Sequence, residues 1–164
     1  MAAGGRRSTK FALDAMLGSL ARKLRAFGFD SAYYKDATDS AILSSCARQG
    51  RVLVTADREL AARAGKRGLS ALLVSGQSDR ARLLQMIAAS RETGLRLTRG
   101  EPRCSVCDGR LVGLAAVEAR KKVPESVAGR HRLFYSCSNC GRVYWRGGHW
   151  KKLRSLEALF KRQP

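Results

Sequence analysis

Apolar residues in the first hundred positions gather in short runs that alternate with longer amphipathic stretches. The runs are typical of buried β-strands, and we expect strands over residues 10–13, 29–34, 51–55 and 69–74. Between and after them, apolar residues recur at helical spacing, which predicts helices over residues 15–27, 39–48, 58–64 and 79–91. This alternation favours an α/β fold, with a parallel sheet flanked by helices and joined by right-handed crossovers.

The pattern changes after the fourth predicted helix. Residues 93–102 combine glycine, proline and charge, which is typical of a linker. We therefore expect four segments: a flexible basic tail over residues 1–9, an α/β domain over 10–98, a small second domain over 99–150, and a basic C-terminal helix over 151–164.

The charge of the chain indicates which classes of partner it can be expected to bind. It carries 32 Lys and Arg against 13 Asp and Glu, a formal net charge of +19, and both halves are basic. Such an excess favours a polyanion, with RNA first and DNA second, although a merely solvated surface or anionic lipid remains an alternative. No apolar run is long enough to cross a bilayer and the first residues lack the apolar core of a signal peptide, so we expect an intracellular, cytoplasmic protein without a membrane partner.

Four cysteines form two Cys-x-x-Cys pairs in the second domain: Cys104 with Cys107, and Cys137 with Cys140. Two such pairs can close a tetrahedral thiolate site around zinc, which predicts a zinc ribbon; the alternative is a pair of disulfides. Gly109 and Gly141 follow the pairs and suit the tight turns that bring amides close to the sulfurs. A site closed by four thiolates leaves no position for water, so this zinc is expected to be structural.

The interval between the cysteine pairs, residues 108–136, is longer than in the simplest ribbons. We expect an extended hairpin or a small insertion to accommodate it. The fifth cysteine, Cys46, lies among apolar residues of a predicted helix and is interpreted as a buried core residue.

Aspartates follow the predicted strands of the first domain. Asp14 comes after the first strand, Asp36 and Asp39 after the second, and Asp57 after the third. The carboxyl ends of parallel strands meet at one edge of a sheet, so these side chains are candidate ligands of Mg²⁺ or Mn²⁺ for two-metal phosphodiester hydrolysis. The alternative is that each aspartate only caps the following helix, which is the interpretation we favour for Asp79.

Basic and aromatic residues are candidates for holding RNA. Arg22 and Arg25 are neighbours on the first predicted helix and could contact phosphate; the alternatives are a solvated helix face or pairing with an aspartate. Trp150 could stack on an unpaired base, whereas Trp145 and Tyr144 are more typical of a small ribbon core and His149 of a hydrogen-bonding residue. The full candidate set for RNA binding is Arg22, Arg25, Arg58, Arg146, Trp150, Lys151 and Lys152.

Three stretches carry a resemblance to a known family: residues 13–30, residues 52–60, and the two cysteine pairs with residues 141–149. Over about residues 10–150 the chain resembles the C-terminal RNase domain of Mut-seven-type proteins, which are PIN-like nucleases with an attached zinc ribbon. The resemblance implies a PIN-like fold and metal-dependent hydrolysis of RNA. It matches Asp14, Asp39 and Asp57 to the family's acidic positions, with Asp36 as an auxiliary. Ala56 and Gly148 stand where the family tends to show arginine and serine.

Three interpretations of the function follow. The leading hypothesis is a ribonuclease with a carboxylate-held Mg²⁺ or Mn²⁺ and a structural zinc. The alternative is a non-catalytic, basic RNA-binding protein of a ribonucleoprotein, in which the aspartates are caps. A DNA-binding transcription module is a third, weaker interpretation, because it leaves the aspartates without a role.

Overall fold

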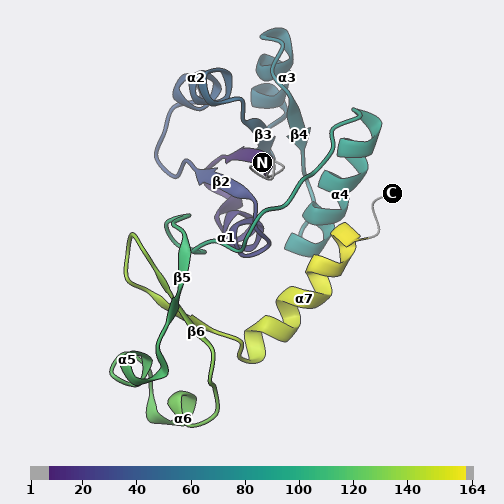
Figure 1. The fold of residues 1–164 in the computed structure, drawn as a ribbon. Helices are drawn as coiled ribbons and strands as arrows, with labels where there is room; N and C mark the ends of the chain where they lie inside the picture. Colours follow the sequence, from purple (N-terminus) through teal and green to yellow (C-terminus); the bar gives the residue numbers. More distant parts are fainter. Residues whose placement is uncertain (1–7, 162–164) are drawn as a thin grey trace, which may run out of the picture.

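The computed structural model describes residues 8–161 (Figure 1). Its first domain holds a parallel sheet with strand order β2-β1-β3-β4. The strands are β1 (Lys10–Leu13), β2 (Asp30–Tyr33), β3 (Val52–Thr55) and β4 (Ala71–Leu73). Each lies within its predicted run, which confirms the parallel α/β fold. Most of the predicted tail, residues 1–7, and the last residues of the predicted terminal helix, 162–164, lie outside the described part.

Helices cover both faces of this sheet. They are α1 (Gly18–Ala26), α2 (Asp39–Gln49), α3 (Arg58–Lys66) and α4 (Asp79–Glu92). Side chains alternate along a strand, so Phe11 and Leu13 pack with α1 and α4 while Ala12 packs with α2 and α3. The helix predicted over residues 15–27 is divided: a 3-10 turn, η1 (Ala15–Leu17), precedes α1. Cys46 is buried on the α2 face, as predicted.

The second domain is a three-stranded antiparallel sheet of β5 (Leu111–Leu114), β6 (Phe134–Cys137) and β7 (Val143–Trp145). Two short helices, α5 (Ala116–Arg120) and α6 (Glu125–Ala128), lie between β5 and β6 at the end of the domain far from the first sheet (Figure 1). They are the small insertion that the long interval between the cysteine pairs predicts.

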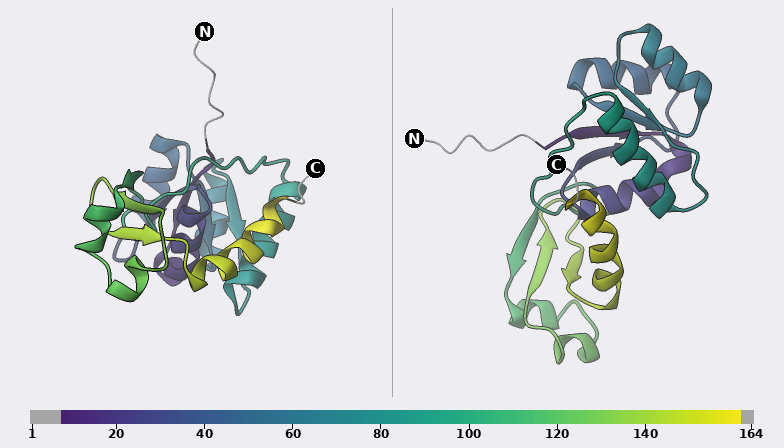
Figure 2. Two further views of the ribbon diagram at one scale, coloured as in Figure 1. Left: turned by 60° about the horizontal axis from the view of Figure 1, so that its bottom comes forward. Right: turned by 90° about the vertical axis from the view of Figure 1, so that its right-hand side faces the viewer.

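The last helix, α7 (Gly148–Lys161), leaves the second domain and returns to the first (Figure 2). It packs beside α4, and Phe160 joins the larger apolar cluster with 7% of its surface exposed. The Phe160 ring lies 5.8 Å from that of Phe27 and 5.2 Å from that of Phe29, between ring centroids. This helix begins three residues before the predicted start at 151 and is part of the first domain's core.

The linker has no helix or strand, as predicted, but its backbone is held along the first domain. The Thr9 amide donates to the Thr98 carbonyl at 2.7 Å, and the Gly100 amide donates to the Gly28 carbonyl at 2.9 Å. The Arg103 amide then donates to the carbonyl of Arg25, at 2.9 Å, just before the first cysteine. These bonds fix where the second domain begins relative to α1.

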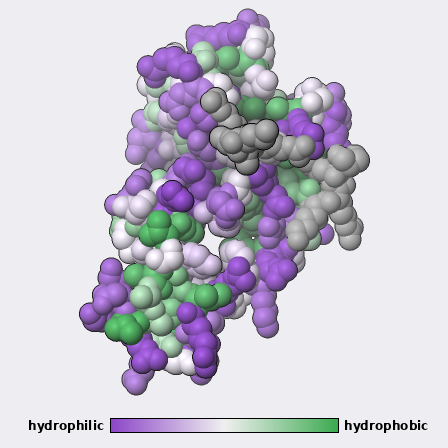
Figure 3. All heavy atoms as spheres, in the orientation of Figure 1, coloured by the Kyte–Doolittle hydropathy of each residue, from purple (hydrophilic) through white to green (hydrophobic). Residues whose placement is uncertain are grey.

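The surface differs between the two domains. Polar side chains cover most of the first domain in the view of Figure 3, whereas apolar side chains gather over the second domain below it. Exposed large apolar residues there include Val112, Val117 and Leu133. In the described part, no helix combines the length and apolar character that a membrane span requires.

Candidate functional site

Thr55 connects two of the candidate aspartates at the carboxyl edge of the sheet. Its hydroxyl donates to Oδ2 of Asp14 and accepts from the amide of Asp57, the latter at 2.9 Å. Strands β1 and β3 are neighbours in register, so the residues that follow them come together at this edge. Thr55 is fully buried, and both aspartates are therefore held from inside the domain.

Both aspartates are also engaged as caps. Asp14 is buried; its Oδ1 accepts from the Met16 amide at 3.0 Å and its Oδ2 from the Ala56 amide at 3.3 Å. Asp57 is exposed, and its Oδ1 accepts from the amides of Glu59 and Leu60, at 2.7 and 3.1 Å. Within residues 8–161 no hydrogen bond to the second oxygen of Asp57 is found, so this oxygen is available to a ligand.

The other two candidate acids lie apart from this pair. Asp39 opens α2, whose cap is Thr38, and its Oδ2 accepts from Nη1 of Arg63 at 2.6 Å. Asp36 is exposed in the loop before α2. Within the described chain, the only group of three or more metal-ligating side chains close enough to hold one ion is the four cysteines. The edge therefore offers the oxygen ligands that suit Mg²⁺ or Mn²⁺, but the four carboxylates are not close enough together to coordinate one ion.

The sequence-based interpretation of Asp79 as the cap of α4 is wrong, because Ser78 is the cap and Asp79 is the first residue of the helix. Its Oδ2 accepts from Oγ of Ser19 at 2.6 Å and from Nζ of Lys23 at 2.5 Å, which ties α4 to α1. Burial raises the pKa of Asp79, but hydrogen bonds from Lys23 and Ser19 and the charges of Lys23 and Arg82 outweigh burial, so the pKa lies below its usual value.

The four cysteines of the second domain form one cluster. Their Sγ atoms all lie within 4.8 Å of one another, with Cys104 and Cys140 at 3.6 Å and Cys107 and Cys137 at 3.4 Å. These separations are too long for disulfides, which need about 2 Å, and all five cysteines of the chain are free. The cluster fits a tetrahedral thiolate site of the zinc-ribbon type.

The local backbone is shaped for this cluster. A Cβ at Gly109 would lie 2.7 Å from Sγ of Cys137, so only glycine permits the chain to pass this close to the sulfur. The Asn139 amide lies 3.4 Å from the same sulfur and donates to it. The Tyr144 hydroxyl lies 3.0 Å from Sγ of Cys104. These donors are the outer contacts that a thiolate–metal site requires.

Electrostatics favour a cation among the sulfurs. Burial raises the pKa of Cys104, but hydrogen bonds from Tyr144 and from the amides of Cys107 and Val106 outweigh it and lower the pKa to about 6. The Gly109 amide favours ionisation of Cys107, but burial and hydrogen bonds with the three other sulfurs raise its pKa to about 12. Four thiols this close ionise together only when a metal ion neutralises them.

Arg25 lies at the junction of the two domains. It is buried, and its Nε donates to the Ser31 carbonyl at 2.8 Å, while Nη1 donates to the carbonyls of Ser105 and Val106 at 3.1 and 2.8 Å. Burial lowers its pKa, and the charge of Asp108 opposes this. These bonds give Arg25 a role in joining the domains; its contact with RNA stays a prediction.

The remaining RNA-binding candidates are mostly exposed. Arg22, Arg58, Lys151 and Lys152 have open side chains. The guanidinium carbon of Arg146 lies 5.6 Å from the ring centroid of Trp150, a cation–π contact between two of the candidates. The side chain of His149 is outside the described part.

Several residues of this site are absent from the sequence-based set. Thr55 joins two aspartates only because of the sheet register, and a threonine in a strand carries no signal of its own. Asp108 accepts from the Ser31 amide at 3.1 Å and pairs with Arg103 at 2.7 Å. Its positive φ of 62° is unusual for a residue with a side chain. In the sequence, the only signal for Asp108 is its position directly after Cys107, a candidate zinc ligand.

Comparison with known proteins gives one match. The family model described as Mut7-C RNAse domain matches residues 9–156, which span both domains and most of α7. No curated protein and no solved structure matches the chain.

Proposed function

This chain belongs to the Mut7-C RNAse domain family, and we propose that it hydrolyses RNA phosphodiester bonds with Mg²⁺ or Mn²⁺ at the edge formed by Asp14, Thr55 and Asp57. The observation that supports this most is the Thr55 hydroxyl, which connects the carboxylate of one aspartate with the backbone of the other. A cap alone does not need such a connection, because each aspartate already accepts from its own helix.

In this proposal Asp14 and Asp57 hold the divalent ion. The ion would polarise the phosphodiester and activate water. Asp14 is fixed by three hydrogen bonds and contributes a rigid carboxylate, whereas Asp57 is exposed and has one oxygen without a hydrogen bond in the described residues. Asp39 joins them only after it leaves Arg63, and Asp36 is positioned in the loop beside it.

We further propose that the cysteine cluster holds zinc in a structural role. Four thiolates close the coordination shell, so the ion orders the ribbon and does not activate water. Arg22, Arg58, Arg146, Lys151 and Lys152 would hold the RNA backbone, and Trp150 would stack on a base, since these side chains combine positive charge with an aromatic face.

The alternative function is a non-catalytic RNA-binding protein. The observation that favours it is the capping by Asp14 and Asp57 together with the ion pair of Asp39 and Arg63. In that case the edge is structural, and the basic surface alone accounts for the affinity for RNA.

The test is cleavage of labelled single-stranded RNA with Mn²⁺, using wild type, Asp57→Asn and the matched control Glu59→Gln. Asparagine caps helices as well as aspartate does, so Asp57→Asn keeps α3 while it removes the ligand charge. We expect the rate to fall at least about 100-fold for Asp57→Asn, because losing a ligand of the ion should cost at least as much as losing a group that only supports a ligand, which costs up to about 100-fold. The rate of Glu59→Gln, which is exposed in the same turn, should stay near wild type. Equal cleavage by all three proteins would reject this edge as the catalytic site. Tight, salt-sensitive binding without cleavage by wild type would support the non-catalytic alternative.

A further inference from the structure

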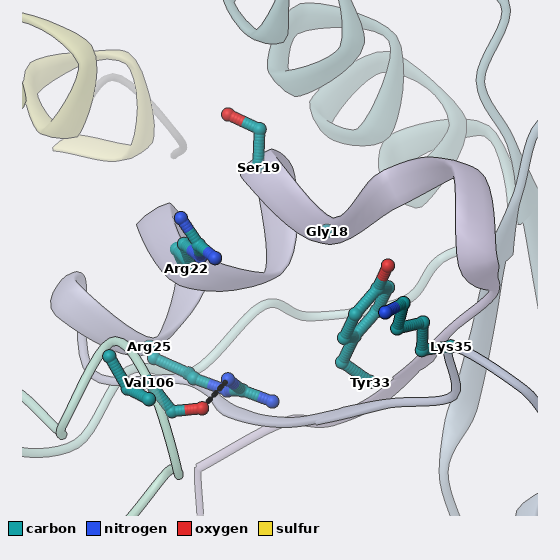
Figure 4. Close-up of a pocket in the computed structure, with 7 residues that line it drawn as sticks. All are labelled: Gly18, Ser19, Arg22, Arg25, Tyr33, Lys35 and Val106. Carbon is teal, nitrogen blue, oxygen red and sulfur yellow. Dashed lines mark hydrogen bonds between the residues drawn. The ribbon is translucent and has the colours of Figure 1, made fainter.

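We propose that a basic pocket between α1, β2 and the first cysteine pair binds a phosphate group of RNA, and that the cysteine pair forms one of its walls. This inference rests on the proposed function. The pocket has a volume of about 460 Å³. Its lining residues, which define the knuckle pocket below, are Gly18, Ser19, Arg22, Arg25, Tyr33, Lys35 and Val106 (Figure 4).

The charge of the knuckle pocket is of one sign. Arg22, Arg25 and Lys35 line it, and no acidic residue does. Arg22 and Lys35 are exposed and have no hydrogen bond or ion pair within residues 8–161, so their charges are not compensated by the protein. Cations that line one concave site favour an anion, and the planar guanidinium of arginine matches phosphate oxygens.

Two uncharged lining residues, Tyr33 and Gly18, place the knuckle pocket beside the sheet edge that carries Asp14. Tyr33 donates its hydroxyl to the carbonyl of Ala15, at 2.9 Å, and Ala15 directly follows Asp14. A Cβ at Gly18 would lie 2.9 Å from Cζ of Tyr33, so glycine lets the ring lie against the start of α1. Figure 4 shows the ring next to the Lys35 side chain. The ring is half-buried and packs against the larger apolar cluster, so it forms a fixed wall beside the cations that would hold the phosphate.

The first cysteine pair completes the pocket from the second domain. Val106 lies between Cys104 and Cys107 and is 43% exposed. The carbonyls of Ser105 and Val106 accept both bonds of Arg25 Nη1, so the backbone between the two cysteines positions this cation (Figure 4). A metal ion that orders the cysteine pair therefore orders one side of the pocket. The ribbon would thus take part in forming the substrate site.

The experiment measures binding of a labelled single-stranded oligouridylate without added divalent ion or chelator, so that cleavage is absent and zinc is retained. The first variant is Val106→Glu, which places a negative charge on the pocket wall. The first control is Val106→Gln, because glutamine has the shape of the introduced glutamate without its charge. The second control is Asn139→Glu, because Asn139 holds the equivalent position in the second cysteine pair and does not line the pocket. We expect Val106→Glu to weaken binding about tenfold through like-charge repulsion, and both controls to bind like wild type.

A second comparison uses exposed cations, whose substitution leaves the fold intact. Arg22→Gln and Lys35→Gln should each reduce the slope of log affinity against log salt by roughly 0.7, as expected when one contact to a single strand is lost. Arg48→Gln, an exposed arginine at the end of α2, is the matched control and should leave the slope unchanged.

Oligonucleotides with a 5′-phosphate and with a 5′-hydroxyl distinguish the two sources of the phosphate. If only the phosphorylated strand responds to Val106→Glu, the pocket holds a terminal monoester; if both respond, it holds a backbone diester. Both results support the site.

The proposal is overturned if Val106→Glu retains its metal and binds RNA as tightly as Val106→Gln, and if Arg22→Gln shows the same salt dependence as Arg48→Gln. This holds even when the protein cleaves RNA. If Val106→Glu loses its metal, Arg22→Gln and Lys35→Gln decide the question. If the expected binding pattern appears but wild type does not cleave RNA, the hydrolytic function is rejected and the phosphate site is retained.

Discussion

The two domains are stabilised by different means. Two apolar clusters cover the two faces of the parallel sheet, with large fully buried side chains such as Phe11, Leu20 and Leu53. In the described second domain, the buried apolar residues are few: Cys104, Ala119, Phe134 and Cys137. Two of these are metal-ligand candidates. We therefore expect a domain of this size, with so little apolar burial, to depend on a metal ion held by the four cysteines, whereas the first domain has a large apolar core.

The two domains are not structurally independent of each other. Arg25 joins α1 to the first cysteine pair, and α7 carries the chain from the second domain back into the core of the first. Three substitutions test how far each domain depends on its metal site, its core and the contacts between its helices.

The largest effect is expected for Cys137→Ser. It removes one thiolate from the cluster, and structural zinc contributes about 10–16 kcal/mol to the folding of small zinc domains. We expect one metal ion per chain in wild type and none in the variant, together with rapid proteolysis of the second domain. Elemental analysis and limited proteolysis measure both. The matched control is Cys46→Ala, a buried cysteine outside the cluster, which should keep its metal. Full metal content in Cys137→Ser would show that the second domain does not depend on this site.

An intermediate effect is expected for Phe160→Ala. The ring packs on Phe27 and Phe29, and its loss leaves a cavity, which costs about 3 kcal/mol for a buried phenylalanine. Urea unfolding of the first domain in the presence of zinc measures this cost, and the metal content should be unchanged. Leu133→Ala, at a residue that is 60% exposed, should stay within about 0.5 kcal/mol of wild type. A negligible cost for Phe160→Ala would mean that α7 does not contribute to the core.

The smallest effect is expected for Asp79→Asn, which weakens the contact between α4 and α1. We expect a loss of about 1–2 kcal/mol near neutral pH, because a partly buried charged hydrogen bond is removed. The folded-state pKa of Asp79 is lowered below its ordinary 3.8. Its contribution is therefore fully present above pH 3.8 and is lost as the pH falls through the folded-state pKa.

Urea unfolding of wild type and Asp79→Asn at neutral and acidic pH measures this dependence. The difference between them should shrink as the pH falls below 3.8. Glu118→Gln, which breaks the exposed pair with Lys121, should differ from wild type by less than about 0.5 kcal/mol at either pH. A difference for Asp79→Asn that does not change with pH would show that the ion pair is not its cause.

The sequence alone predicted the strands of the first domain and the cysteine cluster. Short apolar runs in a fully buried parallel sheet leave a strong pattern, and each strand lies within its predicted run. Two Cys-x-x-Cys pairs likewise indicate a site by spacing alone. The Mut-seven resemblance is confirmed by the family match over residues 9–156. The catalytic and RNA-binding roles of individual residues remain predictions.

The docking of α7 could not be predicted in the same way. Its apolar face, with Leu153, Leu156 and Phe160, indicates that the helix has a partner, but amphipathic spacing does not identify which surface that is. The same holds for Thr55 and Val106. Their importance comes from the register of β1 and β3 and from the packing of the ribbon on α1, and neither is encoded by local spacing.

The return of α7 has a consequence for how the chain is made. Synthesis runs from the amino terminus, and domains commonly begin to fold as they leave the ribosome. Phe160 follows the whole ribbon in sequence, so the parts of Phe27 and Phe29 that it covers stay exposed until the ribbon has emerged. Of these two domains, the one that is made earlier is thus completed later.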